Sequence, residues 1–202
     1  MQKAILPLSY YQSEDTLGLG VDLLGKFLIT DFGDKGRTGG MIVETESYLA
    51  PEDKASHAYN FRRTNRTEVM YSSGGVAYVY LCYGMHHLFN IVTHKKGVPH
   101  AILIRAIELT DGIDTALERL EKKALSPRAA SGPALLSKAL GIKNIHTGIN
   151  LSQNQIWIED RGVSFESGDI AAKPRIGIDY AEEYARKNWR FYIKNHSAVS
   201  KR

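Results

Sequence analysis

Apolar and polar residues alternate over several stretches of the chain, and this alternation predicts short β-strands. A period of two is typical of a strand with one buried face, because successive side chains point to opposite sides of the sheet. The expected strands span residues 26–30, 41–48, 76–82, 88–93, 101–107, 156–158 and 190–193. The glycine-rich segment 31–40 separates the first two, so we expect an antiparallel hairpin around a long turn.

Apolar residues at helical spacing predict helices at 13–25, 111–120 and 132–140, and a polar helix is expected near 180–187. The third helix has proline at its start, Pro133, and glycine after its end, Gly141. Residues 49–75 are polar without clear periodicity, which favours a functional loop or short helices. No repeat or shift in composition marks a boundary, so we expect residues 1–202 to form one domain of mixed α/β (α+β) class.

Composition narrows the class of protein without identifying it. The chain has 202 residues, 43% of them hydrophobic and 24% charged, as in ordinary globular proteins. An excess of 26 Lys and Arg over 22 Asp and Glu gives a net charge of +4, which suits a polyanionic partner without requiring one. Residues 76–83 form the longest apolar run, too short for a bilayer, and no signal-peptide core precedes Pro7. With a single cysteine, Cys82, we expect a cytoplasmic protein without disulfides or membrane contact.

The chain lacks the residues that several kinds of chemistry require. One cysteine and no His-Glu-x-x-His motif argue against a metal site, and the pair His86-His87 is better explained by an exposed turn. The sequence Gly18-Leu19-Gly20 lacks the third glycine and the preceding strand of a dinucleotide-binding loop. Cys82 lies in an apolar strand, where we expect a buried thiol. We therefore expect neither metal nor cofactor.

The strand at 41–48 carries an unusual polar face. Alternation places Met41 and Val43 on one side and Glu44, Glu46 and Tyr48 on the other. In a cleft, a carboxylate beside a tyrosine could act as a general base on water. Spacing alone favours the simpler arrangement, an exposed strand face with solvated glutamates.

A second unusual stretch is rich in tyrosine. Tyr78 and Tyr80 share one face of a strand, while Tyr83 lies on the other face near a probable turn. Tyrosines can stack on nucleic-acid bases, although aromatic residues in a strand more often belong to the core. Because Tyr83 and Met85 flank Gly84 at the turn, where large apolar groups are poorly buried, we interpret the turn as a contact surface.

Together, short stretches along almost the whole chain carry a family resemblance. They are residues 43–49, 51–53, 78–80, 83–85, 103–106, 131–133 and 190–192, with His57 and Asn90. In this order the chain resembles the alkyladenine (3-methyladenine, methylpurine) DNA glycosylases of the mammalian alkyladenine type, as a bacterial member.

The resemblance implies a single compact domain with a curved, mainly antiparallel sheet, surrounding helices and a protruding β-hairpin that inserts into DNA. It implies a monofunctional enzyme of base-excision repair that flips a damaged purine out of duplex DNA and hydrolyses its N-glycosidic bond, leaving an abasic site. The implied substrates are 3-methyladenine, 7-methylguanine, hypoxanthine and ethenoadenine. No lysine at the matched positions could form a Schiff base, which argues against strand cleavage. A monomer would contact double-stranded DNA through the minor groove.

By the family pattern, Glu46 would be the general base that activates water, and Arg105 would hold Glu46, the water or a nearby phosphate. Tyr48 and Tyr80 would sandwich the flipped base, while His57 would read its edge by hydrogen bonding. Cationic bases such as 7-methylguanine would stack well between electron-rich rings and leave readily. Neutral bases such as hypoxanthine would need a proton.

The remaining family positions concern selectivity and DNA distortion. Asn90 would line the pocket and exclude undamaged guanine through a clash with its exocyclic amine. Tyr83 and Met85 would intercalate where the base has left. The chain departs from the family pattern at 64–67, which bears on substrate range, and at 86–89, which bears on the grip of the hairpin on DNA.

Two other functions remain open at this point. One is a non-catalytic module that binds damaged DNA or structured RNA, and the other is a hydrolase of free nucleosides. The glycosylase hypothesis predicts that Glu46, Tyr80 and Arg105 converge on one pocket beside the Tyr83 turn.

Overall fold

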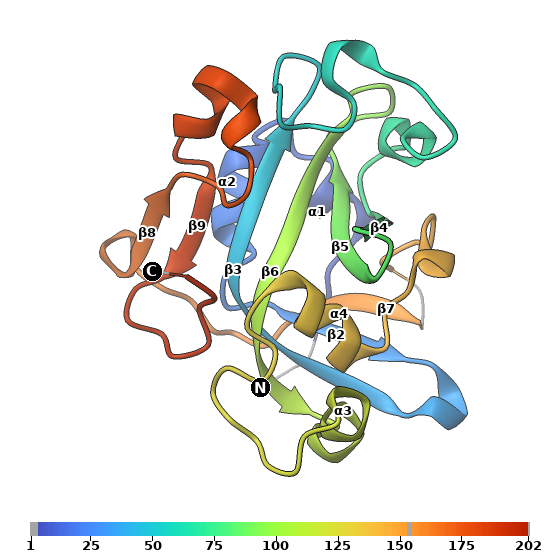
Figure 1. The fold of residues 1–202 in the computed structure, drawn as a ribbon, viewed down its shortest axis with the longest axis vertical. Helices are drawn as coiled ribbons and strands as arrows, with labels where there is room; N and C mark the ends of the chain where they lie inside the picture. Colours follow the sequence, from blue (N-terminus) through green and yellow to red (C-terminus); the bar gives the residue numbers. More distant parts are fainter. Residues whose placement is uncertain (1–3, 153–154, 202) are drawn as a thin grey trace.

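The computed structural model describes residues 4–152 and 155–201, and a single curled sheet dominates it (Figure 1). The expectation about a signal segment rests partly on residues 1–3, which lie outside the described residues. Within the described ranges, nine strands pair, all of them antiparallel. They are β1 (Ala4–Ile5), β2 (Phe27–Asp31), β3 (Arg37–Leu49), β4 (Val76–Cys82), β5 (His86–Thr93), β6 (His100–Asp111), β7 (Ile156–Asp160), β8 (Ile170–Lys173) and β9 (Arg190–Ile193).

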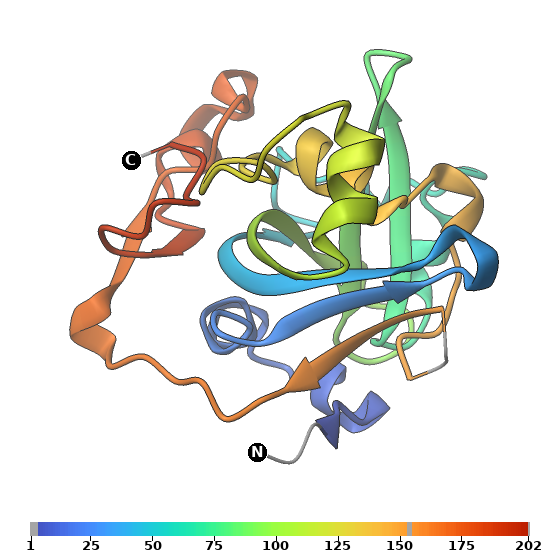
Figure 2. The same ribbon diagram turned by 90° about the horizontal axis from the view of Figure 1, so that it is seen from below.

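The longest strand, β3, organises the sheet. The order is β1-β7-β2-β3-β6-β5-β4, and β9 pairs with both β3 and β8. One edge of β3 pairs with β6, while the other pairs first with β2 and then, over residues 44–46, with β9. The β3–β6 register shifts near Gly39 and on both sides of Glu44, and such bulges bend a strand and increase its twist. The sheet therefore curls, as Figures 1 and 2 show, and the predicted mixed α/β class with a curved antiparallel sheet is confirmed.

Helices cover the sheet. The structure has α1 (Leu8–Tyr11), α2 (Thr16–Asp22), α3 (Ile113–Leu120) and α4 (Pro133–Leu140), with 3₁₀ turns that include Glu68–Tyr71, Asn144–His146 and Asp179–Arg186. The helix α2 begins after Asp15, whose Oδ1 accepts a hydrogen bond of 2.8 Å from the backbone N–H of Gly18. Leu136 and Leu140 of α4 pack into the main core with strand residues such as Phe89. None of the helices in the described ranges is long and apolar enough to cross a membrane.

Two predicted elements differ from the structure. The turn expected at 31–40 is shorter, because β3 begins at Arg37 and includes Gly39 and Gly40. A Cβ on Gly40 would lie 2.2 Å from the carbonyl oxygen of Glu108, so glycine here permits close approach of two strands rather than a turn. The helix expected near 180–187 is a 3₁₀ segment, interrupted where Glu182 adopts a φ of 50°.

Candidate active site

One row of paired residues crosses four strands and underlies a cavity of about 410 Å³. Tyr78 of β4 is paired with Asn90 of β5, Asn90 with Leu103 of β6, and Leu103 with Glu46 of β3. Directly paired residues point to the same face of a sheet, and all four line the cavity. On the opposite face of β3, the Thr45 hydroxyl donates to the carbonyl of Gly20 in α2.

The structure brings together the predicted site residues, with one exception. The residues Glu46, Tyr48, His57, Tyr80, Tyr83, Asn90 and Arg105 all line this cavity. Met85 instead borders a separate groove that lies against α4. The expected convergence of Glu46, Tyr80 and Arg105 beside the hairpin is therefore present in the structure.

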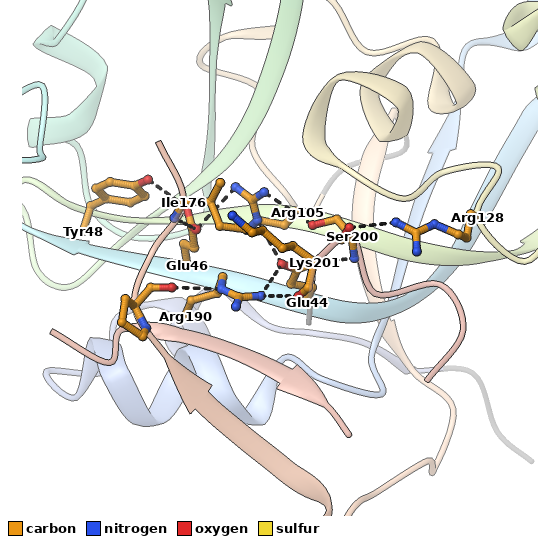
Figure 3. A network of polar contacts seen from close by, with 10 residues as sticks. Glu44, Glu46, Tyr48, Arg105, Arg128, Ile176, Arg190, Ser200 and Lys201 are labelled. Atoms are coloured by element: carbon orange, nitrogen blue, oxygen red, sulfur yellow. Dashed lines mark hydrogen bonds and ion pairs between the residues drawn. The ribbon is translucent and has the colours of Figure 1, made fainter. Parts of the chain in front are cut away.

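Glu46 lies at the floor of the cavity and is fully buried. Its Oε1 accepts a 2.8 Å hydrogen bond from the N–H of Ile176 and lies 3.3 Å from Nη1 of Arg105, while Oε2 accepts from the Tyr48 hydroxyl at 2.9 Å (Figure 3). Glu44 is also fully buried. The expectation of an exposed strand face with solvated glutamates is wrong, because the arginine side chains of β6 and β9 and the segments at Ile176 and Ser200 contact both carboxyl groups.

Opposing influences act on the Glu46 carboxyl. Burial raises its pKa, and the nearby charge of Glu44 raises it further. Arg105, the Ile176 N–H and the Tyr48 hydroxyl lower it, but the pKa remains above the ordinary value. Burial also raises the pKa of Tyr48, so its hydroxyl stays protonated and donates to Glu46. A carboxylate whose pKa is raised in this way is a stronger base than an ordinary glutamate, which suits it to accept a proton.

Aromatic rings form the wall of the cavity. The ring of His57 meets that of Tyr80 edge to face, with centroids 4.6 Å apart, and its Nδ1 lies 2.7 Å from the Tyr78 hydroxyl. Burial, together with the charges of Arg66 and Arg62, lowers the pKa of His57 to about 4, so the ring is neutral at pH 7. Arg66 lies 3.4 Å from the His57 Nε2, and because a guanidinium can only donate, this contact favours the tautomer in which Nδ1 carries the proton and donates to Tyr78.

A buried ion pair supports the Tyr48 side of the cavity. The guanidinium of Arg175 lies 4.6 Å from the centre of the Tyr48 ring and forms two hydrogen bonds with Asp53, of 2.5 and 2.8 Å. It also donates to the carbonyl of Ser47. Arg175 therefore fixes the segment that supplies the Ile176 N–H to Glu46. Sequence reasoning missed Arg175 and Ile176, because their partners lie more than a hundred positions earlier.

The side chain of Asn90 is fixed at the back of the cavity. It is only 3% exposed, and its Nδ2 donates to the carbonyls of Tyr78 at 3.1 Å and Leu88 at 3.3 Å. These two bonds set the orientation of the amide. An amide held in this way can present a defined edge to whatever occupies the cavity.

The β4–β5 hairpin projects from the rest of the fold, as Figure 2 shows, and Tyr83 at its tip lines the cavity. At its tip Tyr83 and Gly84 adopt φ values of 50° and 71°, and the N–H of Met85 donates to the carbonyl of Cys82. Tyr83 is 89% exposed and Met85 69% exposed. Large apolar side chains exposed on a protruding turn indicate a contact surface.

Three neighbouring residues differ from expectation. Cys82 is half-buried rather than buried. His86 and His87 lie in β5 rather than in the turn, and His87 accepts a hydrogen bond from the N–H of Asn144. In the part of the chain that the structure describes, no three His, Cys, Asp or Glu side chains are grouped to hold a metal ion.

The chain is similar to known proteins over almost its full length. The family model for methylpurine-DNA glycosylase matches residues 9–197. A protein of Chlamydia felis (strain Fe/C-56), named "Putative 3-methyladenine DNA glycosylase", is 45% identical over 190 residues, covering 94% of this chain and 96% of that protein. Proteins with the same name from Chlamydia abortus (strain DSM 27085 / S26/3) and Bacillus cereus (strain G9842) are each 46% identical, over 95% and 97% of this chain and 100% and 98% of their own lengths. The chain therefore belongs to the methylpurine-DNA glycosylase family.

Proposed function

We propose that this protein is a monofunctional DNA glycosylase that flips an alkylated or deaminated purine out of duplex DNA and hydrolyses its N-glycosidic bond. Family membership supports the DNA glycosylase role. The observation that carries the mechanism is the buried Glu46 carboxyl, which faces an aromatic cavity and has a raised pKa. The enzyme would act as a monomer in the cytoplasm, where it meets DNA, and without a cofactor.

Hydrolysis of the N-glycosidic bond develops positive charge at the sugar C1′ as the base departs. In the proposed reaction, Glu46 takes a proton from water while the water oxygen bonds to C1′. The electron pair of the broken C–N bond stays with the base. The ionised carboxylate also stabilises the developing positive charge, and Arg105 favours that ionised form.

The cavity wall supports recognition of the flipped purine. Tyr48 and Tyr80 would stack on the base, and a cationic base such as 3-methyladenine or 7-methylguanine gains most from electron-rich rings. His57, neutral at pH 7, would read the edge of the base. Asn90, held by two hydrogen bonds, would clash with the exocyclic amine of undamaged guanine. Hypoxanthine and ethenoadenine would need a proton before they leave.

The hairpin tip supplies the proposed means of base flipping. Tyr83, which lines the cavity, and Met85, which borders the separate groove, are both exposed at the tip, where they could enter the minor groove and fill the space that the base leaves. Removing a base from the stack costs a few kcal/mol, and an intercalated ring replaces part of the lost stacking. The net charge of +4 favours the approach to DNA.

The deciding experiment measures single-turnover base release from duplex oligonucleotides that carry 7-methylguanine, hypoxanthine or ethenoadenine. Alkali reveals the abasic sites. We expect release by the wild type and a loss of about 10²- to 10⁴-fold in Glu46→Gln, the usual contribution of a general base. DNA binding by Glu46→Gln should be retained. The exposed Glu166→Gln, which makes the same change of charge, is the matched control.

Two outcomes would contradict the proposal. Lesion-selective binding without release from any substrate would indicate a non-catalytic DNA-binding module. Hydrolysis of free nucleosides that does not depend on salt concentration would indicate a nucleoside hydrolase, because duplex binding weakens as salt rises.

A further inference from the structure

A second buried carboxylate lies beside Glu46, and the proposed reaction does not use it. Glu44 is fully buried and is not among the residues that line the cavity. Its Oε1 accepts hydrogen bonds from Nε of Arg105 at 3.1 Å and Nη1 of Arg190 at 2.9 Å, and its Oε2 accepts from the N–H of Ser200 at 2.7 Å. Burying a charge is costly even when it is paired, so the arrangement calls for a role.

Arg105 connects the two carboxylates. One edge of its guanidinium, formed by Nε and Nη2, faces Glu44 and the hydroxyl of Ser200, the latter at 3.4 Å. Its Nη1 faces Glu46 at 3.3 Å. A guanidinium is planar and rigid, so contacts that fix one edge also aim the other atoms. The position of Nη1 against Glu46 is therefore set by Glu44 and Ser200 (Figure 3).

The chain after β9 returns to this network and is held in it. Besides the contacts above, the carbonyl of Ser200 accepts from Arg128 at 2.8 Å, and the carbonyl of Lys201 accepts from Arg190 at 2.8 Å. Ala198 is buried. Ser200 and Lys201 follow the residues that the family model matches, which end at residue 197.

We propose that residues 198–201 form a latch that holds Glu44 and Arg105 in place and thereby positions the catalytic carboxylate Glu46. The inference rests on the proposed function of Glu46 as the base. Glu44 and Ser200 are positioning residues, since neither lines the cavity. When the latch opens, Glu44 loses the donor on Oε2, and Arg105 is free to turn away from Glu46.

The effect on Glu46 gives the latch a distinctive signature. The titratable and charged groups around this carboxyl are Arg105 from β6, Tyr80 from β4, and Glu44 and Tyr48 from β3, with Arg190 paired opposite in β9. Arg105 holds the pKa of Glu46 down against the effect of burial. A displaced Arg105 should raise this pKa further and move the acid limb of the rate profile to higher pH. If the latch had only a structural role, opening it would lower the stability of the protein without moving that limb.

The test uses Ser200→Pro, which removes the N–H that Glu44 Oε2 accepts. Single-turnover release of 7-methylguanine is followed against pH, and the Glu46 carboxyl is titrated by ¹³C NMR. We expect both the limb and the titration to move up by about one pH unit, with release about tenfold slower below the limb and unchanged well above it. Ser200→Ala keeps the N–H and loses only the long hydroxyl contact, so its shift should be smaller.

Deletion of residues 200–202 opens the latch without introducing proline and should reproduce the shift. The proposal is overturned if the rate profile and the Glu46 titration of both Ser200→Pro and the deletion variant match those of the wild type. It is also overturned if these variants lose stability without a shift in the pKa of Glu46. A wild type that released no purine would instead contradict the proposed function. In that case the NMR titration of Glu46, which needs no activity, still decides whether the latch positions this carboxyl.

Discussion

The floor of the cavity and the tip of the hairpin are built in opposite ways. At the floor, Glu46 is fully buried, and both of its oxygens accept hydrogen bonds from groups that are themselves held in place. At the tip, Tyr83 is 89% exposed and Met85 69% exposed. One region is complete within the protein, whereas the other presents apolar surface that only a partner could cover.

This difference indicates how the two regions would contribute to the proposed reaction. A preorganised polar site requires no rearrangement during the chemical step, which is where electrostatic stabilisation acts. An exposed apolar tip contributes little to folding and, under the proposed function, would gain its contacts when DNA is bound. Substitutions at the floor should therefore affect folding or chemistry, and substitutions at the tip should affect the DNA step alone.

The largest expected effect on folding comes from the ion pair that supports the floor. Asp53→Asn removes the negative charge that faces Arg175, and both side chains are fully buried. Breaking such a pair leaves a buried charge without its partner and typically costs about 3–5 kcal/mol of stability. We expect the free energy of unfolding, measured by urea denaturation, to fall by about 3 kcal/mol or more.

The matched control is Glu68→Gln, which breaks the ion pair of Glu68 with Arg63 on the surface. These two side chains are 58% and 59% exposed, and exposed pairs contribute little to stability. The unfolding curve of this variant should stay close to that of the wild type. Equal losses of stability in the two variants would show that the buried pair contributes no more to the free energy of unfolding than the exposed pair does.

A smaller effect, confined to DNA, is expected at the tip. Tyr83→Ala removes the ring that would fill the gap left by the flipped base, and stacking on one base is typically worth about 1–3 kcal/mol. Release from a duplex lesion should slow by about 10- to 100-fold, while release from the same lesion in single-stranded DNA should change less. Tyr83→Phe, which keeps the ring, should retain most of the rate.

Thermal unfolding tests whether the effect of Tyr83→Ala is confined to DNA or extends to the stability of the protein. Because Tyr83 is exposed, Tyr83→Ala should melt at the wild-type temperature. A lower melting temperature together with equal loss on duplex and single-stranded substrates would place Tyr83 among the structural residues rather than at a DNA contact.

The sequence predicts the parts of the fold that depend on local pattern better than those that depend on distant contacts. The strands at 76–82 and 190–193 match β4 and β9, because alternation of side chains is a local property. Proline and glycine likewise mark the ends of α4 correctly. The error at Gly39 and Gly40 arises because glycine serves both turns and close strand contacts, and only the partner strand decides which.

The site shows where local pattern stops being informative. Alternation placed Glu46 and Tyr48 on one face, but whether that face is buried depends on β6, on β9 and on the N–H of Ile176, 130 positions away. The exposed tip at Tyr83 needs no distant contact and was anticipated from its flanking glycine. Arg175 and Ser200 carry no motif, and they gain importance only where the fold places them beside β3.

The smallest expected effect comes from removing a single hydrogen bond at the floor, the one that the Tyr48 hydroxyl donates to Glu46. The pKa of Glu46 is raised, so release of 7-methylguanine by the wild type should fall as pH drops through a value above the usual glutamate pKa of about 4.3. Tyr48→Phe keeps the ring and removes the hydroxyl that stabilises the ionised carboxyl. The pKa should therefore rise further, by about one unit for a hydrogen bond to a charged group.

The acid limb of the rate profile of Tyr48→Phe should accordingly move to higher pH, with release about tenfold slower below it and equal to wild type above it. Tyr80 lines the same cavity, but the hydrogen bonds that Glu46 accepts come from Tyr48 and Ile176, so Tyr80→Phe should move the limb less. A limb that stays in place or moves to lower pH in Tyr48→Phe would mean that this hydroxyl does not stabilise the ionised base. In that case Arg105 and the Ile176 N–H would be the groups that keep Glu46 ionised, and the floor would depend on β6 and the 176–178 segment rather than on its own strand.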